Sequence, residues 1–239
     1  MNKIGIIIPT YNEGEEVFKL VEEINKNISF VKIIIIDDSY ESKIKEINSR
    51  FKNVIYINRK RKLGRGSAVI LGLKNLIKIG VKIFVEMDAD YSHRPGEIKK
   101  NIKIFKKKKL DLLISSRYLK KSKIINWPLK RKLFSKASNL LARFLLKIPI
   151  TDYTNGFRIY SVRAANNIVR KCGKIGDGFI ILSEIIVVLY LKKFKIDETP
   201  TIFINRKRGE SSVNLRLIFS SFIGLIRIYV KKLLTNDSQ

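Results

Sequence analysis

The run KIGIIIP at residues 3–9, with TYNE directly after it at residues 10–13, sets a pattern that the chain repeats. A short apolar run rich in β-branched residues is typical of a strand buried on both faces of a sheet. Two more such runs are VKIIIID at residues 31–37 and NVIYIN at residues 53–58. Because helical stretches separate these runs, we expect right-handed crossovers and a mainly parallel sheet.

The alternation of strands and helices continues along the rest of the chain. Further strands are predicted at residues 81–87, 111–115, 156–160 and 201–205. The first helix is expected to be capped by Asn12, and others are predicted at residues 66–79, 97–108, 129–147, 180–194 and 215–234. We therefore expect one α/β domain, residues 1–212, with helices on both faces of its sheet, followed by an amphipathic helix within residues 213–239.

The composition narrows the function classes. The chain has 239 residues, 45% of them hydrophobic, which excludes a disordered basic tail protein. A single Cys and a single His exclude a disulfide framework and a Cys- or His-based metal site. The 49 Lys and Arg exceed the 21 Asp and Glu, giving a net charge of +28. This excess favours a polyanionic partner, either nucleic acid, an anionic membrane or a phosphorylated substrate, although a solvated lysine surface stays open.

Acidic residues nevertheless follow the predicted strands. Asp37 and Asp38 end the second strand, Asp88 and Asp90 follow the fourth, and Tyr11 follows the first. Ligands of open parallel sheets bind beyond the carboxyl ends of the strands. We therefore expect these side chains to share one binding edge.

The D-x-D segment of Asp88 and Asp90 can offer carboxylate oxygens to a hard divalent cation bridging a diphosphate. The alternative for this segment is a surface turn with two capping aspartates. Asp37 and Asp38 have no obvious cation nearby in the sequence and could accept hydrogen bonds from a base or a ribose. For Asp38 a helix cap is the alternative. Gly64-Arg65-Gly66 opens a helix whose amides could face an anion, although a flexible turn is its simpler interpretation.

The order and spacing of several motifs resemble the family 2 glycosyltransferases of the GT-A fold, and within them the dolichyl-phosphate mannose synthase group. The resemblance runs to about Ser212. Its most specific segments are S-R-Y at residues 116–118, W-P-L at residues 127–129 and D-Y-T-N-G-F-R at residues 152–158. The other matching residues are Ile8 to Glu13, Asp37 to Ser39, Gly64 to Gly66, Met87 to Asp90, Ser92, His93, Arg131, Ser135, Glu184, Arg206, Gly209 and Ser211. Tyr40, Leu182 and Ser212 depart from the usual pattern, which leaves the sugar and the base open.

The resemblance implies a role for each matching site residue. The nucleoside would be held by Pro9, Tyr11, Glu13, Asp37 and Asp38. Asp88 and Asp90 would hold a divalent metal, Mg²⁺ or Mn²⁺, and the diphosphate. The acceptor lipid's phosphate would be bound by Arg117, Arg131 and Ser135. Arg206 would stand beside the departing diphosphate, and Asp88, Asp90, Arg117 and Arg206 would together form the catalytic set.

The expected reaction is transfer of a hexose, mannose from GDP-mannose in first place, to a polyprenyl or dolichyl phosphate with inversion. A phosphate monoester, with its second pKa of about 6, is mostly dianionic at neutral pH and needs cations rather than a general base. His93 is accordingly interpreted as structural. The alternatives are a UDP-glucose-using enzyme, a family 2 transferase with a hydroxyl acceptor, and a nucleic-acid-binding protein, the last disfavoured by the acidic strand ends.

The predicted C-terminal helix is relevant to whether the chain associates with a membrane. Residues 217–230 are apolar but contain Arg227 and are shorter than the roughly 20 residues of a membrane span. An interfacial helix on an anionic membrane and a helix packed on the domain both stay open. We expect a peripheral protein on the cytoplasmic face of a membrane, with room for a separate membrane subunit and without nucleic acid as a partner.

Overall fold

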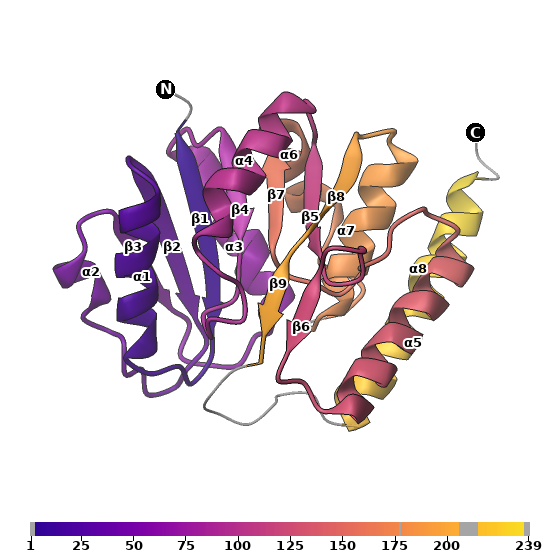
Figure 1. The fold of residues 1–239 in the computed structure, drawn as a ribbon, viewed down its shortest axis with the longest axis horizontal. Coiled ribbons are helices and arrows are strands. Elements are labelled where there is room, and N and C mark those ends of the chain that lie inside the picture. Colours follow the sequence, from indigo (N-terminus) through magenta and orange to yellow (C-terminus); the bar gives the residue numbers. More distant parts are fainter. Residues whose placement is uncertain (1–2, 177, 206–214, 237–239) are drawn as a thin grey trace.

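The structure, a computed structural model, describes residues 3–176, 178–205 and 215–236. At its centre lies a seven-stranded sheet of order β3-β2-β1-β4-β7-β5-β8 (Figure 1). Its strands are β1 (Ile4–Thr10), β2 (Val31–Asp37), β3 (Val54–Asn58), β4 (Ile83–Glu86), β5 (Leu112–Ser116), β7 (Arg158–Ser161) and β8 (Ile196–Pro200). A small parallel sheet pairs β6 (Lys123–Ile125) with β9 (Ile202–Ile204).

The predicted α/β class with a mainly parallel sheet is confirmed. β3, β2, β1 and β4 pair in parallel, as do β5 and β8. β7 lies between β4 and β5 and runs antiparallel to both. The sequence did not predict β8 because its IDETP is polar and ends in Pro, which an edge strand tolerates since only one side is paired.

Helices connect the strands over both faces of the sheet. They are α1 (Glu16–Asn27), α2 (Ile47–Arg50), α3 (Arg65–Lys78), α4 (Glu97–Lys107), α5 (Leu129–Leu146), α6 (Val162–Lys171), α7 (Ile180–Leu191) and α8 (Leu215–Asn236). The expectation that Asn12 caps the first helix is wrong, because α1 begins at Glu16 and Asn12 adopts a left-handed φ of 56°. The backbone of Asn12 is used instead to turn the chain at the end of β1.

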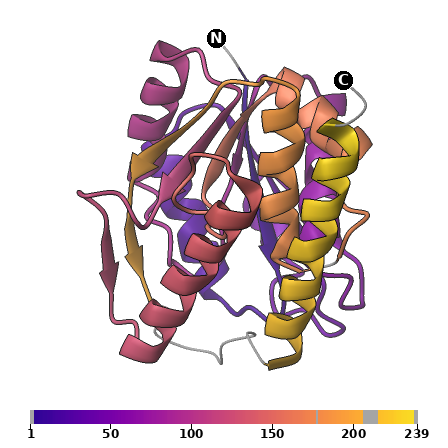
Figure 2. The ribbon, with the colours of Figure 1, turned by 90° about the vertical axis from the view of Figure 1, so that its right-hand side faces the viewer.

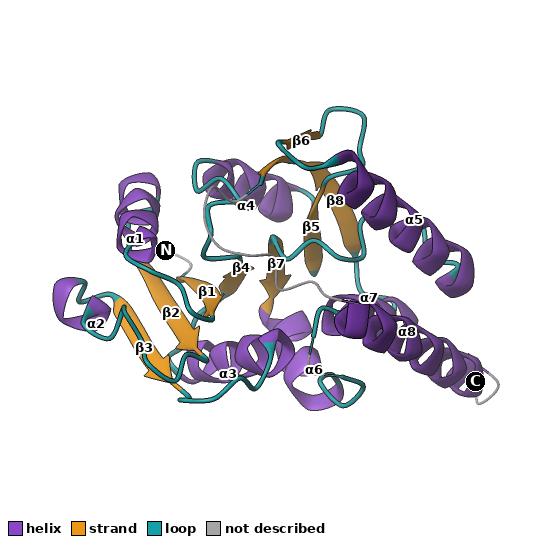
Figure 3. Ribbon diagram, turned by 90° about the horizontal axis from the view of Figure 1, so that it is seen from below, coloured by secondary structure: helices purple, strands orange, loops and turns teal. Residues whose placement is uncertain are grey.

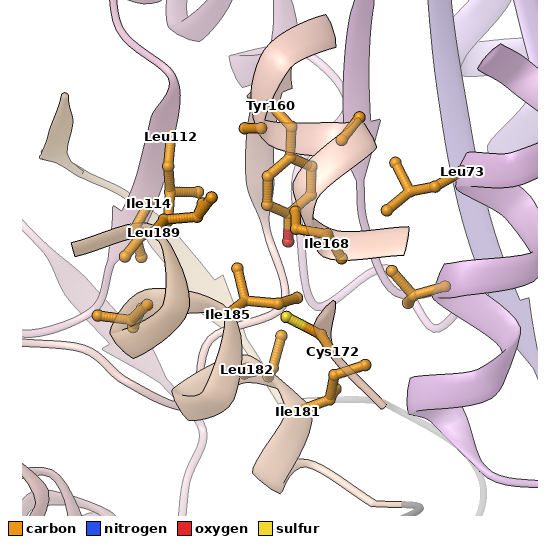
Figure 4. Close-up of a cluster of buried hydrophobic side chains, with 14 of the residues drawn as sticks. Leu73, Leu112, Ile114, Tyr160, Ile168, Cys172, Ile181, Leu182, Ile185 and Leu189 are labelled. Carbon is orange, nitrogen blue, oxygen red and sulfur yellow. The ribbon is translucent and has the colours of Figure 1, made fainter. Parts of the chain in front are cut away.

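Two hydrophobic layers enclose the sheet, with α1 and α4 on one face and α3 and α6 on the other (Figure 3). Ile6 and Ile8 point into the first layer, whereas Ile7 points into the second. This alternation explains why the strands read as continuous apolar runs. Part of the second layer gathers Tyr160, Cys172 and other buried side chains between α6, α7 and β5 (Figure 4).

The C-terminal helix packs on the domain. α8 lies against α7 and also contacts α5, which stands at the same end of the sheet (Figures 1 and 2). Leu225 and Ile228 of α8 are buried in the layer that covers α7. Lys232 donates a hydrogen bond to the carbonyl of Leu146 at the end of α5, at 2.5 Å.

We expect Gly72→Ala to destabilise the chain by about 1–3 kcal/mol, the usual cost of overpacking a core. A Cβ at Gly72 in α3 would lie 2.6 Å from Cγ2 of Ile7 on β1, a contact that requires the helix to move off the sheet. Urea denaturation gives the free energy of unfolding. Gly14→Ala is the matched control because a Cβ there meets nothing within 4 Å. Equal midpoints for the two variants would contradict the close packing of α3.

Candidate functional site

The loops after β1, β2 and β4 meet at the carboxyl edge of the sheet, the end seen in Figure 3. β1 lies between β2 and β4 in parallel, so the three strands end side by side. The amide of Asp38 donates to the carbonyl of Thr10 at 3.0 Å, and that of Met87 donates to the carbonyl of Ile7 at 3.1 Å. The predicted clustering of strand-end residues at one edge is therefore confirmed.

Asp37 is buried and its carboxylate organises the loop after β2. It accepts hydrogen bonds from the hydroxyl of Ser39 at 2.5 Å and from Tyr56 at 2.8 Å. The Ser39 hydroxyl in turn accepts the backbone N–H of Asn12 at 2.8 Å, which ties this loop to the one after β1. Burial, with a contribution from Asp37, raises the pKa of Tyr56, so this phenol remains a donor at neutral pH.

Asp38 is also buried, and a cation pairs with it. Arg59 Nε lies 2.5 Å from one carboxylate oxygen, and the amides of Leu63 and Gly64 donate to the other at 2.9 Å each. This cation lies 21 residues from Asp38 along the chain, which is why none was apparent nearby in the sequence. The amides of Leu63 and Gly64 before α3 do face an anion, as the functional interpretation of the Gly64-Arg65-Gly66 segment suggested, and that anion is the carboxylate of Asp38.

The other predicted nucleoside residues line the opening of this edge. Tyr11 is 41% exposed, and Lys62 Nζ lies 4.5 Å from the centroid of its ring. Pro9 is the penultimate residue of β1, and Glu13 is half-buried in the loop before α1. An aromatic face beside a cation is accessible here to a planar ligand.

His93 fixes the backbone of the D-x-D loop through a hydrogen bond. The backbone N–H of Asp88 donates to His93 Nδ1 at 3.1 Å, so this nitrogen carries no proton and Nε2 donates to Asn155 at 2.8 Å. His93 is fully buried and stacks on Phe157. Asp90 accepts hydrogen bonds from the amide and hydroxyl of Ser92. These contacts fit the interpretation of His93 as a structural residue.

Arg65, the first residue of α3, reaches the same loop, although its side chain had no predicted role. Its guanidinium forms an ion pair with Glu86 and donates to Asp88 Oδ1 at 2.9 Å. Burial lowers the pKa of Arg65, but the two carboxylates outweigh burial and raise it above its ordinary value. Tyr160 donates to the other oxygen of Glu86 at 2.5 Å. The G-R-G segment was the only signal in the sequence, and alone it indicated no more than a turn.

A second centre forms around Arg117 after β5. Its Nε and Nη2 bind the two oxygens of Asp152 at 2.8 Å each, and Nη2 donates to Thr154 at 2.6 Å. Burial opposes ionisation of both partners. The pair nevertheless raises the pKa of Arg117 and lowers that of Asp152, and the charge of Asp88 also acts on Arg117. The two centres are therefore electrostatic neighbours.

Arg131 and Ser135, on the first turns of α5, extend this second centre. Arg131 Cζ lies 4.3 Å from the centroid of the Trp127 ring, and Arg117 Cζ lies 5.3 Å from it. Ser135 accepts the hydroxyl of Tyr118 at 2.6 Å. Arg117 and Arg131 thus share one indole ring, and Ser135 is linked to Arg117 through Tyr118, whose ring centroid lies 5.6 Å from Arg117 Cζ. Arg206 lies outside the described residues.

Residues 152–158 connect the two centres. Asp152 holds Arg117, Asn155 holds His93, and Gly156 lies against Arg65 and Asp88. In the sequence this segment was distinctive only for its resemblance to the family, and none of its residues had a predicted role. In the described part of the chain no three His, Cys, Asp or Glu side chains gather into a metal site.

We expect Asp152→Asn to destabilise the chain by about 3–5 kcal/mol at pH 7, because it leaves Arg117 buried without its counter-ion. The pKa of Asp152 lies below its ordinary value of 3.8 in the folded chain. Its contribution is therefore complete above pH 4 and disappears as the pH falls through the lowered value. Urea denaturation between pH 7 and 3 should show a flatter acid limb for the variant. Parallel curves would contradict this assignment.

Several proteins of similar sequence are named as enzymes of sugar transfer. A "Dolichol-phosphate mannosyltransferase" of Pyrococcus furiosus is 36% identical over 95% of this chain, which spans 63% of that protein. A "Polyprenol monophosphomannose synthase" of Mycolicibacterium smegmatis and an "Undecaprenyl-phosphate mannosyltransferase" of Micrococcus luteus are each 29% identical, covering 87% and 94% of this chain and 80% and 93% of their own.

Solved structures of low sequence identity share the fold. Glucosyl-3-phosphoglycerate synthase from Mycobacterium tuberculosis, in complex with Mn²⁺, UDP-glucose and phosphoglyceric acid, has a TM-score of 0.68 at 13% identity, over 97% of this chain and 79% of its own. The GT-A arrangement expected from the sequence is therefore confirmed. The sequence profile described as "Glycosyl transferase family 2" matches residues 5–169, from β1 into α6. The chain belongs to glycosyl transferase family 2.

Proposed function

We propose that this chain transfers a hexose, mannose from GDP-mannose in first place, to the phosphate of a polyprenyl or dolichyl phosphate. The names of the three relatives described above support a lipid phosphate acceptor and mannose. The observation that carries the proposal is the pair of guanidiniums around Trp127 next to the aspartate loop. A donor site rich in carboxylates beside an acceptor site rich in arginine suits a reaction between a metal-bound nucleotide and a second phosphate.

Asp88 and Asp90 are proposed to hold a divalent metal with the donor's diphosphate. Asp88 is 27% exposed at its side chain, and both residues offer the hard oxygen ligands that Mg²⁺ and Mn²⁺ prefer. Structures of the same fold have been solved in complex with Mn²⁺ and UDP or UDP-glucose, which supports a divalent ion. When bound, such an ion would neutralise charge on the leaving diphosphate. Pro9, Tyr11, Glu13 and Asp37 remain the proposed nucleoside contacts, and Asp38 is proposed to act indirectly.

Asp38 takes an indirect part in this proposal. Its oxygens already hold Arg59 and two amides, so it would shape the nucleoside pocket by fixing the loop before α3. Tyr11 offers the exposed ring on which a base would stack.

The acceptor phosphate is proposed to bind between Arg117 and Arg131. Arg117 keeps its charge because Asp152 compensates its burial, and its planar fork suits a phosphate oxygen. Ser135, already an acceptor for the hydroxyl of Tyr118, would donate its own proton to the phosphate. The guanidiniums would orient the lipid phosphate and lower the repulsion between it and the donor.

The proposed chemistry is a direct displacement at the anomeric carbon with inversion. A phosphate oxygen attacks, the bond to the diphosphate breaks, and no proton has to be removed from the dianion. The single histidine suits this mechanism, because both of its ring nitrogens are engaged in the interior and it is not available as a base. Arg206 is proposed to stabilise the leaving diphosphate.

The test is incubation with polyprenyl phosphate, Mg²⁺ or Mn²⁺, and a panel of labelled donors that includes GDP-mannose and UDP-glucose. We expect lipid-linked mannose, and a loss of about 100-fold or more in kcat for Asp88→Asn and Asp90→Asn, as for other electrostatic catalytic groups. Transfer of glucose in place of mannose would show that UDP-glucose, and not GDP-mannose, is the donor. No lipid-linked sugar from any donor would overturn the function.

Arg131→Ala should raise the KM for polyprenyl phosphate about tenfold or more, because a charged hydrogen bond contributes about 1.5–3 kcal/mol. The KM for the donor should stay unchanged in the same detergent assay. Arg143→Ala is the matched control, since Arg143 is an exposed arginine on the same helix. Equal acceptor KM values for the two variants would remove Arg131 from the acceptor site.

Membrane association is proposed to use the outer face of α5, which extends the expectation placed on residues 213–239. Six large apolar side chains on α5 are exposed: Leu129, Leu133, Phe134, Leu140, Leu141 and Phe144. Exposed lysines on the same helix, Lys130 and Lys136, accompany this apolar face. An apolar face with cationic flanks suits the boundary of an anionic bilayer.

If the protein docks on the membrane through α5, the lipid phosphate would lie close to the proposed acceptor site. Arg131 and Ser135 lie on the same helix as the apolar face, so a phosphate at the bilayer surface would reach them without leaving the membrane. On α8, Ile226, Val230 and Leu233 are also exposed and would enlarge the face. None of the described helices is long and apolar enough to cross a membrane. We propose a peripheral position on the cytoplasmic face, with a separate membrane subunit as a possible addition.

Leu133→Gln with Phe144→Gln should weaken binding to vesicles about tenfold or more, because each buried apolar side chain contributes about 1.5–3 kcal/mol. Co-sedimentation with phosphatidylcholine–phosphatidylglycerol vesicles measures the effect. Phe30→Asn is the control, since Phe30 is 82% exposed but lies in the turn between α1 and β2. If the control lowers binding as much, the apolar face of α5 is not the docking surface.

A further inference from the structure

Arg65 places a fixed positive charge inside the D-x-D centre. Its side chain is 11% exposed and stands between Glu86, which is fully buried, and Asp88, which is the more exposed of the two. The Phe179 ring lies 5.8 Å from its Cζ and adds a further contact. Glu86 accepts a hydrogen bond from Tyr160 and pairs with the guanidinium of Arg65. The guanidinium also donates to Asp88 Oδ1.

Gly156 leaves the space that this guanidinium occupies. A Cβ built on Gly156 would lie 2.1 Å from Arg65 Nη2 and 3.2 Å from Asp88 Oδ1. Any larger residue at this position would therefore displace Arg65 from the carboxylate. The loop that carries Gly156 is itself fixed by the Arg117–Asp152 pair, so the position of Arg65 depends on the acceptor side of the site.

The ligand set at this centre is incomplete for a metal ion alone. Glu86 is neutralised by Arg65, and the same guanidinium competes with any cation for one oxygen of Asp88. Within the described ranges no third acidic, histidine or cysteine ligand joins Asp88 and Asp90. Mg²⁺ requires six ligands and Mn²⁺ favours the same oxygen donors, so two carboxylates leave most positions to be filled from elsewhere.

We propose that Arg65 makes metal binding conditional on the nucleoside diphosphate. In the free protein the guanidinium repels the ion and occupies Asp88 Oδ1. The diphosphate supplies the missing oxygens and the negative charge that offset this repulsion, so ion and nucleotide bind together. The inference rests on the proposed function for the identity of the diphosphate, and it assigns Arg65 as a positioning residue that acts through Asp88.

The test is an electron paramagnetic resonance titration of the whole chain with Mn²⁺, alone and with GDP or UDP. For the unchanged protein we expect Mn²⁺ affinity at least tenfold higher with one of the two nucleotides. The variant Arg65→Met with Glu86→Gln removes one charge of each sign. It should bind Mn²⁺ at least tenfold more tightly without nucleotide, and its gain from nucleotide should shrink. Arg65→Lys retains the charge but not the planar fork, so it should raise the nucleotide-free affinity less than the double variant does.

Arg163→Met with Asp111→Asn is the matched control. This ion pair, at 2.5 Å, also carries one charge of each sign but lies at the start of β5, at the other end of that strand from Arg117. The control should leave Mn²⁺ binding unchanged. Gly156→Ala keeps every charge and displaces the guanidinium, so it should shift the nucleotide-free affinity in the same direction even if the double variant fails to fold.

Two results would overturn the inference. One is Mn²⁺ binding by the unchanged protein that is as tight without nucleotide as with it. The other is nucleotide-free affinity that neither the Arg65→Met pair nor Gly156→Ala alters. Both readouts are independent of sugar transfer. A chain that binds Mn²⁺ only with nucleotide but forms no lipid-linked sugar would retain the role of Arg65 and lose the proposed function.

Discussion

The buried carboxylate of Asp152 is the interaction on which both halves of the site depend. A carboxylate excluded from water has to find its hydrogen-bond donors inside the protein, and Arg117 with the amides of the same loop provides them. Because the loop is fixed in this way, Asn155 can hold His93 and Gly156 can lie against the D-x-D segment. One ion pair thus determines the relative position of the carboxylates and the guanidiniums.

The structure shows that part of the positive charge lies in the interior. Some arginines are buried and pair with carboxylates at the acidic edge of the sheet, as Arg59 does with Asp38. Such buried pairs contribute little net stability compared with apolar residues, but they fix geometry. Exposed lysines such as Lys130 and Lys136 on α5 face outward instead, and contact with the membrane is the role proposed for them.

The sequence was sufficient for the parallel strands because their burial on both faces leaves a continuous apolar run, as in residues 31–37. It was insufficient where local preference and tertiary context disagree. Asn12 has the chemistry of a helix cap, but the turn after β1 uses its left-handed backbone instead. β8 is polar and becomes a strand only because β5 offers it an edge.

The same division applies to the site. Strand ends predicted which carboxylates would meet, because the position of a strand end follows from the fold. Their partners could not be predicted, since Arg59 and Asp38 are 21 residues apart and Arg65 and Asp88 are 23 apart. Such pairings depend on where a helix begins relative to the ends of the strands beside it. The role of Arg65 therefore becomes apparent only when the position of the first turn of α3 is known.

The reversed strand β7 also has a consequence for synthesis of the chain. β4 ends at Glu86, but its second neighbour begins only at Arg158. At about 5–20 residues per second, a ribosome leaves that edge of the nascent sheet unpaired for several seconds. Unpaired edges are templates for association with other chains. Translation therefore passes through an open half-sheet that only the arrival of β7 can close.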